Sequence, residues 1–228
     1  MIKIGIAGAS GYTGLELIRL LNGHPDVELA FLTSEMFQGQ NISEVFPSLN
    51  RVVDLTLRPL DDSITKDCSV LFLALPHLAV MDKLPIYLQS DCKIIDLSAD
   101  YRLKDPKAYS DWYSVRHTHP ELLEQAVYGL PELYREAIQT AQFIANPGCY
   151  PTSVILALAP LLKTGWVDLG SIISDSKSGV SGAGRKPSLT THYTEVNEGI
   201  SPYCLGSHRH TPEMEQELSV LAGKQVRM

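Results

Sequence analysis

The fold is decided by residues 2–21, which read IKIGIAGASGYTGLELIRLL. Residues 2–7 form a run that is apolar apart from Lys3, as expected for a parallel strand that is covered on both faces. Apolar residues with helical spacing occupy positions 15–21, and the turn formers of residues 22–25 end that helix. The glycine-rich segment 8–14 therefore joins a buried strand to a helix.

Strand and helix signals alternate through the first half of the chain. Apolar runs predict further strands at residues 27–33, 70–75 and 93–97. This βαβ rhythm indicates an α/β fold built on a Rossmann-type, doubly wound parallel sheet. Residues 100–134 are rich in Asp, Tyr, His and Pro, and we expect irregular surface structure there.

The pattern changes after residue 147. An apolar run at residues 154–159 predicts a buried helix, and a second helix is expected to begin at Thr211-Pro212-Glu213, with a cap, a proline at its first position and an acidic first turn. Residues 170–175 and 224–228 resemble strands. We expect a nucleotide-binding domain at 1–147 and an α+β catalytic domain at 148–228 that is incomplete at its C-terminal end.

Composition narrows the class of protein. The 228 residues are 44% hydrophobic and 20% charged, as in an ordinary globular protein. The net charge of −7 argues against an electrostatic nucleic-acid surface, and no apolar stretch approaches the roughly eighteen residues of a membrane span. The chain opens directly with a strand rather than a signal peptide. Four cysteines without CxxC spacing suggest neither a disulfide framework nor a zinc site, which favours a reducing cytoplasm.

The turn Gly8-Ala9-Ser10-Gly11-Tyr12-Thr13-Gly14 predicts dinucleotide binding. Its glycines let the backbone approach a pyrophosphate, which would sit at the N-terminus of the following helix. The alternative is a merely structural turn, because the spacing is GxxGxxG rather than GxGxxG. Its position directly after a buried strand favours cofactor binding.

The end of the second predicted strand indicates which cofactor is used. An acidic residue at this point would bind the ribose 2′-hydroxyl of NAD. Thr33 and Ser34 stand there instead, and their hydroxyls tolerate a 2′-phosphate. Glu35 follows and no arginine is adjacent. NADP (NADPH) is therefore the expected cofactor.

Residues 145–152, ANPGCYPT, place Cys149 at the tip of a turn before a helix. The positive end of a helix dipole and its unpaired N–H groups favour the thiolate, so Cys149 is the candidate nucleophile. The alternative for any single cysteine is a small buried side chain. Cys68, Cys92 and Cys204 fit that alternative better.

A second reactive group is predicted at His208-Arg209-His210. A histidine near neutral pKa can exchange protons with a substrate while an arginine holds an anion. An HxH pair can also bind metal, but no third ligand has suitable spacing. The other HxH pair, His117 and His119, is expected at the surface.

Five motifs in order identify a family resemblance. They are residues 8–14 (GASGYTG), 96–102 (DLSADYR), 146–152 (NPGCYPT), 178–185 (SGVSGAGR) and 208–213 (HRHTPE). With these motifs the chain resembles the N-acetyl-γ-glutamyl-phosphate reductases of arginine biosynthesis, relatives of aspartate-semialdehyde dehydrogenase. The resemblance extends over the full chain. Family members continue beyond residue 228, which implies that the second domain is truncated here.

The resemblance implies a reaction and its residues. Cys149 would attack the acyl phosphate, expel phosphate and form a thioester that NADPH reduces to the semialdehyde. His208 would act as acid and base. The resemblance further implies that Ser178 contacts the cofactor and that the substrate is held by Arg102, Asn146, Arg185 and His210. It implies no metal, and it suggests a homo-oligomer.

Two other functions remain open at this point. One is an aminoadipyl-phosphate-type reductase of lysine biosynthesis, but such homologues tend to carry arginines after the serine that ends the second strand, where Glu35-Met36 stand here. The other is an inactive Rossmann binding module, which would need neither Cys149 nor His208. A cysteine hydrolase is disfavoured by the dinucleotide turn.

Overall fold

The computed structural model describes residues 1–228 and divides them into two compact units. Unit 1 comprises Met1–Tyr101 and Thr118–Asn146, and unit 2 comprises Arg102–His117 and Pro147–Met228. None of the helices combines the length and apolar character needed to cross a membrane. The assignment of nucleotide binding to residues 1–147 and of catalysis to residues 148–228 stays a prediction.

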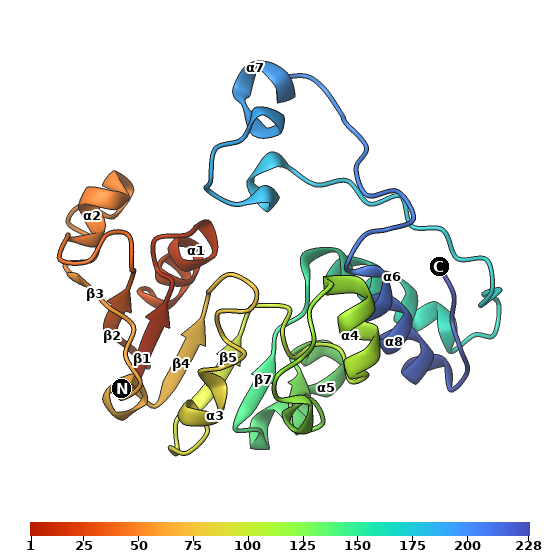
Figure 1. Cartoon of the computed structure of the whole chain (residues 1–228), viewed down its shortest axis with the longest axis horizontal. Coiled ribbons are helices and arrows are strands. Elements are labelled where there is room, and N and C mark those ends of the chain that lie inside the picture. The colour runs from red at the N-terminus through yellow and green to blue at the C-terminus, as the bar shows by residue number, and fades with distance from the viewer. The chain divides into compact units, whose positions relative to one another are not determined.

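Unit 1 is built on seven parallel strands in the order β3-β2-β1-β4-β5-β7-β6 (Figure 1). The strands are β1 (Ile2–Ala7), β2 (Val27–Thr33), β3 (Leu57–Arg58), β4 (Val70–Leu73), β5 (Lys93–Asp96), β6 (Val127–Tyr128) and β7 (Phe143–Ala145). The helices are α1 (Tyr12–Leu21), α2 (Ile42–Val45), α3 (Leu84–Tyr87) and α5 (Pro131–Thr140), with 3-10 turns η1 (Pro47–Leu49), η2 (Ile64–Asp67) and η3 (Pro120–Leu122). The α/β fold expected from the sequence is confirmed.

Hydrophobic cores cover both faces of this sheet. On one face Ile18 of α1 packs with Leu32 of β2, and on the other Leu84 of α3 packs with Leu71 of β4. Successive side chains of a strand point to opposite faces, so a strand between two such cores must be apolar throughout. This explains why β4, and β1 from Ile4 onward, are apolar, and it confirms a doubly wound sheet.

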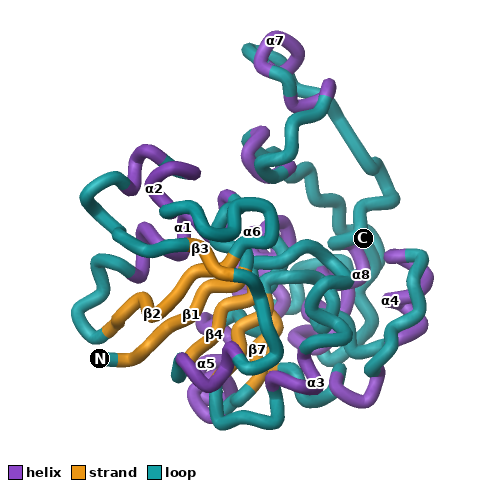
Figure 2. The backbone as a smooth tube through the Cα atoms, turned by 60° about the vertical axis from the view of Figure 1, so that its left-hand side comes forward, coloured by secondary structure: helices purple, strands orange, loops and turns teal.

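Unit 2 contains helices and loops. Its helices are α4 (Pro106–Tyr113), α6 (Cys149–Leu162), α7 (Tyr193–Val196) and α8 (Thr211–Ala222), with 3-10 turns η4 (Val180–Ala183) and η5 (Leu189–Thr191). Helices α6 and α8 pack against each other. Most of the chain between them is loop in Figure 2. Helix α8 begins one residue earlier than expected, because Thr211 is its first residue and His210 precedes it as the cap.

The two strands predicted for residues 170–175 and 224–228 are wrong. None of the strands lies in unit 2, so these segments have no sheet edge with which to pair. Ile173 is accordingly 92% exposed. Val226 is buried instead in a loop, and its N–H donates to Ser219 Oγ at 2.9 Å.

The expectation of irregular surface structure at residues 100–134 is also wrong. This segment contains α4, η3, β6 and the start of α5, and both Tyr101 and Tyr109 are fully buried. Tyrosine can bury its ring while its hydroxyl finds a partner, as Tyr101 does by donating to Met81 O at 2.8 Å. Composition therefore underestimated how much of this segment is core.

Candidate active site

The turn after β1 has the geometry of an anion-binding loop. Gly8 has φ +83°, and a Cβ there would lie 2.2 Å from the Ala74 carbonyl oxygen, so only glycine fits. The Gly8 N–H donates to Thr33 Oγ1 at 3.3 Å. Gly11 precedes α1 without any side-chain cap, which leaves the first N–H groups of the helix facing outward for an anion.

The same turn meets the end of β2. Ser10 Oγ and Ser34 Oγ lie 2.8 Å apart, and Ser34 is buried. Glu35 accepts from the N–H of Leu60 through Oε1 at 3.1 Å. Two hydroxyls therefore stand at the end of β2, while the neighbouring carboxylate is engaged by another backbone segment. The structure brings together all the unit 1 residues predicted to bind cofactor, which are Gly8, Ser10, Gly11, Tyr12, Thr13, Gly14 and Ser34.

Cys149 is the first residue of α6 and its side chain is exposed. Gly148 is the N-cap and supplies no side-chain cap. The Thr152 hydroxyl donates to the Gly148 carbonyl oxygen at 2.9 Å, which fixes the first turn. The thiol thus lies at the positive end of a helix of fourteen residues.

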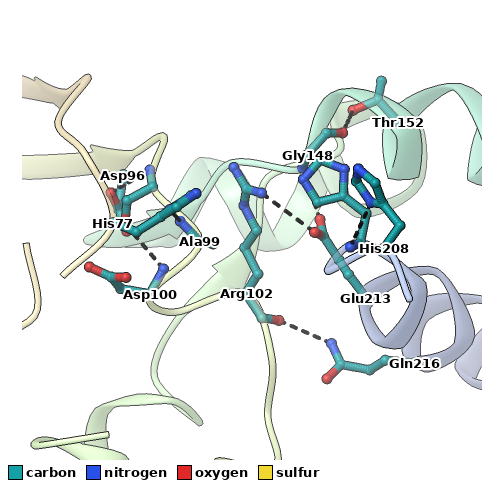
Figure 3. Close-up of polar contacts among 12 residues, drawn as sticks. His77, Asp96, Ala99, Asp100, Arg102, Gly148, Thr152, His208, Glu213 and Gln216 are labelled. Atoms are coloured by element: carbon teal, nitrogen blue, oxygen red, sulfur yellow. Dashed lines mark hydrogen bonds and ion pairs between the residues drawn. The ribbon is translucent and has the colours of Figure 1, made fainter. Parts of the chain in front are cut away.

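A buried charge cluster supports this turn from within unit 2 (Figure 3). Glu213 is only 1% exposed, and its Oε1 accepts from the Gly148 N–H at 2.9 Å. Its Oε2 lies 3.5 Å from a guanidinium nitrogen of Arg102, which is also buried. As the third residue of α8, Glu213 gains further stabilisation from that helix's N-terminus.

Arg102 is held at both ends. Its carbonyl oxygen accepts from Gln216 Nε2 at 3.1 Å (Figure 3). Gln216 Oε1 in turn accepts from the N–H of Lys104 at 2.8 Å. Segment 102–104 is therefore fastened to α8 by a side-chain amide. This contact explains why Arg102–His117 belongs to unit 2 although it follows β5 in the sequence.

Gly148 fits closely against two of the predicted substrate residues. A Cβ on Gly148 would lie 2.7 Å from His210 Nε2 and 3.0 Å from an Arg102 guanidinium nitrogen. The contact with His210 is too short for a real Cβ and the one with Arg102 is tight, so the absence of a side chain lets both residues approach the backbone before Cys149. The predicted residues Cys149, Arg102 and His210 are thereby brought together.

His208 lies in a cluster of aromatic rings that includes Tyr150, the residue after Cys149. Its ring is 5.1 Å from that of Tyr150, 5.5 Å from Tyr203 and 4.7 Å from His210, each edge to face. Its Nδ1 accepts from the His210 N–H at 3.1 Å, which places the proton of the neutral ring on Nε2. Burial, followed by the nearby Arg209 charge, lowers the pKa of His208, so the ring is neutral near pH 7.

The remaining predicted residues lie elsewhere. Ser178 and Arg185 are exposed on the loop that contains η4, rather than in the buried cluster. Asn146 belongs to unit 1, where its N–H donates to the Asp96 carbonyl oxygen at 2.7 Å. Asp96 is the last residue of β5 and Asn146 follows β7, so this hydrogen bond continues the pairing of the two strands by one residue.

Glu213 and Gln216 were missed as site residues. From the sequence, Glu213 was expected only as the last residue of the HRHTPE motif and as part of an acidic first turn, a position that is usually solvent exposed. The available signal was its distance of three residues from His210, which places it on the first turn of the helix that follows the histidines. Nothing in the local sequence of Gln216 distinguishes it from an exposed glutamine.

Comparison with known proteins gives two family matches. The model described as "Semialdehyde dehydrogenase, NAD binding domain" matches residues 3–141, and "Semialdehyde dehydrogenase, dimerisation domain" matches residues 149–228. Among curated relatives, N-acetyl-gamma-glutamyl-phosphate reductase of Syntrophobacter fumaroxidans is 53% identical over 99% of this chain. The same-named protein of Moorella thermoacetica is 52% identical over 100% of it. The chain spans 66% of the length of each.

Solved structures share the fold. Aspartate semialdehyde dehydrogenase II from Vibrio cholerae, complexed with ASA, matches with a TM-score of 0.64 at 16% identity, over 98% of this chain and 67% of that one. Aspartate semialdehyde dehydrogenase with NADP from Candida albicans matches with a TM-score of 0.56 at 17% identity, over 95% of this chain and 59% of that one.

Proposed function

Because this chain belongs to the semialdehyde dehydrogenase family, we propose that it carries the machinery for NADPH-dependent reduction of N-acetyl-γ-glutamyl phosphate to the semialdehyde and phosphate. Identities of 51–53% to relatives that carry the corresponding name support this substrate. The identity extends over 99% or more of the chain. The reaction belongs to arginine biosynthesis.

One observation carries the proposal: the exposed Cys149 thiol stands at the start of α6 on a turn held by a buried carboxylate. The thiolate attacks the acyl carbon, and the C–O bond to phosphate breaks, which leaves a thioester and free phosphate. N–H groups at the start of α6 face the carbonyl oxygen that becomes negative during this attack. Splitting the reduction into acyl transfer and thioester reduction lowers each barrier.

The cofactor is held by the turn after β1. The segment Gly8–Gly14 receives the pyrophosphate at the N-terminus of α1, with Ser10, Tyr12 and Thr13 around it. Ser34 at the end of β2 binds the 2′-phosphate. The family resemblance assigns a further cofactor contact to Ser178. When bound, NADPH supplies the hydride that reduces the thioester to the semialdehyde.

His208 moves the proton. In its neutral form the ring takes up the proton of the Cys149 thiol, and the imidazolium that results returns this proton to the Cys149 sulfur when the semialdehyde leaves. The pKa of His208, lowered by burial, keeps this form populated at neutral pH. The substrate's phosphate and carboxylates are held by Arg102, Asn146, Arg185 and His210, and the buried Arg102 also holds Glu213 in place.

We also propose that the protein works as a homo-oligomer in the cytoplasm. The match of residues 149–228 to a dimerisation domain supports self-association. Large apolar side chains are exposed in the same region and would be covered by a second copy, among them Ile173, Leu189, Ile200 and Leu205. A reducing compartment agrees with four free cysteines. Light scattering coupled to size exclusion tests the oligomer directly.

The experiment that tests the function runs the reaction backwards. N-acetylglutamate semialdehyde and NADP are mixed with the full chain, and NADPH absorbance is followed with and without phosphate. We expect phosphate-dependent NADP reduction and little activity with NAD. The one-carbon-longer aminoadipyl analogue serves as the matched substrate control, and faster turnover of it would assign the lysine pathway. NADPH binding without any turnover would indicate an inactive binding module.

A further inference from the structure

Two thiols of unit 1 lie in contact and take no part in the proposed reaction. Cys68 Sγ and Cys92 Sγ are 3.6 Å apart, the distance of touching sulfur atoms. Both cysteines are free. In the sequence, each of them resembles an independent packing residue, because 23 residues separate them and neither belongs to a recognisable motif.

The fold places this pair where two neighbouring strands begin. Cys68 follows η2 and lies two residues before β4, and Cys92 immediately precedes β5. The strands pair in parallel with Val70 opposite Lys93, so their amino ends lie side by side. The turn at residues 8–14, which we propose binds the cofactor, follows the carboxyl end of β1. The two thiols therefore lie at the opposite end of the parallel strands.

A cavity gives small molecules access to one thiol of the pair. Cys68 is half-buried and lines a hollow of about 570 Å³. Three cationic side chains, Lys3, Arg58 and Lys66, line the same hollow together with Glu28 and Asp67. Cys92 is only 3% exposed. An oxidant that enters the hollow therefore meets Cys68 first.

The contact makes the two thiols chemically unequal. The hydrogen bond from Cys92 lowers the pKa of Cys68, although burial acts in the opposite direction. The same contact, together with burial, raises the pKa of Cys92. Cys68 is therefore the better nucleophile, whereas Cys92 stays protonated in the reduced protein.

We propose that Cys68 and Cys92 form a reversible intrachain disulfide site that responds to hydroperoxides. The Cys68 sulfur attacks one oxygen of hydrogen peroxide, the O–O bond breaks, and sulfenic acid and water result. The Cys92 sulfur then attacks the Cys68 sulfur and releases a second water. Two thiols and one peroxide thus give one disulfide and two waters. The bridge closes a loop that contains β4 and α3 and fastens β4 to β5.

The test uses the full chain with the other two cysteines replaced, Cys149→Ser and Cys204→Ser. The folded protein is treated with one equivalent of hydrogen peroxide, and free thiols are counted by Ellman titration before and after. We expect two thiols to fall to none, with loss of two hydrogens in intact mass and a peptide joining Cys68 to Cys92. Dithiothreitol should restore both thiols. The bridged chain should have a Tm higher by roughly 5 °C or more, since the loop restricts the unfolded state.

Single replacements in this background separate the roles of the two thiols. With Cys92→Ala, dimedone should label Cys68 as sulfenic acid, because no second thiol resolves it. With Cys68→Ala, Cys92 should stay reduced, because it is buried. The proposal is overturned if both thiols survive peroxide in the folded background protein, if the bridge forms only in urea, or if it joins two chains.

Discussion

The Gly148 N–H donates to Glu213 Oε1 at 2.9 Å, so a carboxylate buried in α8 holds the residue directly before the exposed Cys149. The other oxygen of this carboxylate faces Arg102 at 3.5 Å. One side chain thereby links the turn of the proposed nucleophile to a residue proposed to contact substrate. The hydrogen bond from Gly148 to Glu213 therefore fixes the start of α6 against α8.

Replacing Glu213 should destabilise unit 2 strongly. Glu213→Ala leaves the Arg102 guanidinium and the Gly148 N–H buried without this acceptor, and we expect a loss of about 3–5 kcal/mol in the free energy of unfolding. Urea unfolding measures it. Glu213→Gln keeps the shape of the side chain and one acceptor oxygen, so it should lower the free energy of unfolding less than Glu213→Ala does. Glu195→Gln, on exposed α7, is the matched control and should change stability little. Equal effects of Glu213→Ala and Glu195→Gln would contradict the role of the cluster.

Gly148→Ala should disturb the same cluster by steric clash. The added methyl would meet His210 and Arg102 at 3.0 Å or less, and overpacking of this kind costs about 1–3 kcal/mol. We expect lower stability and a fall in kcat. Gly23→Ala provides the control, since a Cβ there meets nothing within 4 Å. A Gly148→Ala protein with wild-type unfolding and turnover would show that the close approach is unimportant.

The acid limb of the pH profile should depend on Arg209. Folding lowers the pKa of His208 through burial and the Arg209 charge, so the native state binds fewer protons than the unfolded one below about pH 6.5. His208 therefore lowers stability as pH falls through that range. Arg209→Gln should raise the pKa of His208 and move the acid limb of kcat/KM to higher pH. Arg209→Lys keeps the charge and should leave the acid limb at its wild-type pH. Identical pH profiles for Arg209→Gln and Arg209→Lys would exclude the electrostatic effect.

Ser34 should control the choice of cofactor. Ser34→Asp places a negative charge where we propose the 2′-phosphate, and we expect NADPH affinity to fall by about tenfold or more, or ~1.4 kcal/mol. NADH affinity should change little. Fluorescence titration measures both, and Ser34→Ala separates loss of the hydroxyl from repulsion. A parallel loss of NADPH and NADH binding would point to a folding defect instead of specificity.

The local features of this fold were predictable, and the non-local ones were not. Strand β1, the turn at Gly8 and the thiol at the start of α6 follow from apolar periodicity and turn residues, which act over a few positions. Strands β3 and β6 have two residues each and exist only because neighbouring strands pair with them. Residues 170–175 have strand-like composition but no such neighbour.

The candidate site shows the same division. Cys149, His208 and the dinucleotide turn lie in sequence motifs that predict their chemistry. Glu213 contacts Arg102 across 111 residues, and only the packing of α8 explains why this acidic side chain is buried rather than solvated. Cys68 and Cys92 likewise become a pair only through the register of β4 and β5.

The most direct test of the account is to trap the acyl group on Cys149. The full chain is mixed with N-acetyl-γ-glutamyl phosphate in the absence of NADPH, quenched in acid and analysed by intact mass and peptide mapping. The thioester mechanism predicts one acyl group per active chain on the peptide that contains Cys149, release of one phosphate, and no adduct in Cys149→Ser. Turnover that persists in Cys149→Ser, with no adduct in the native protein, would contradict it.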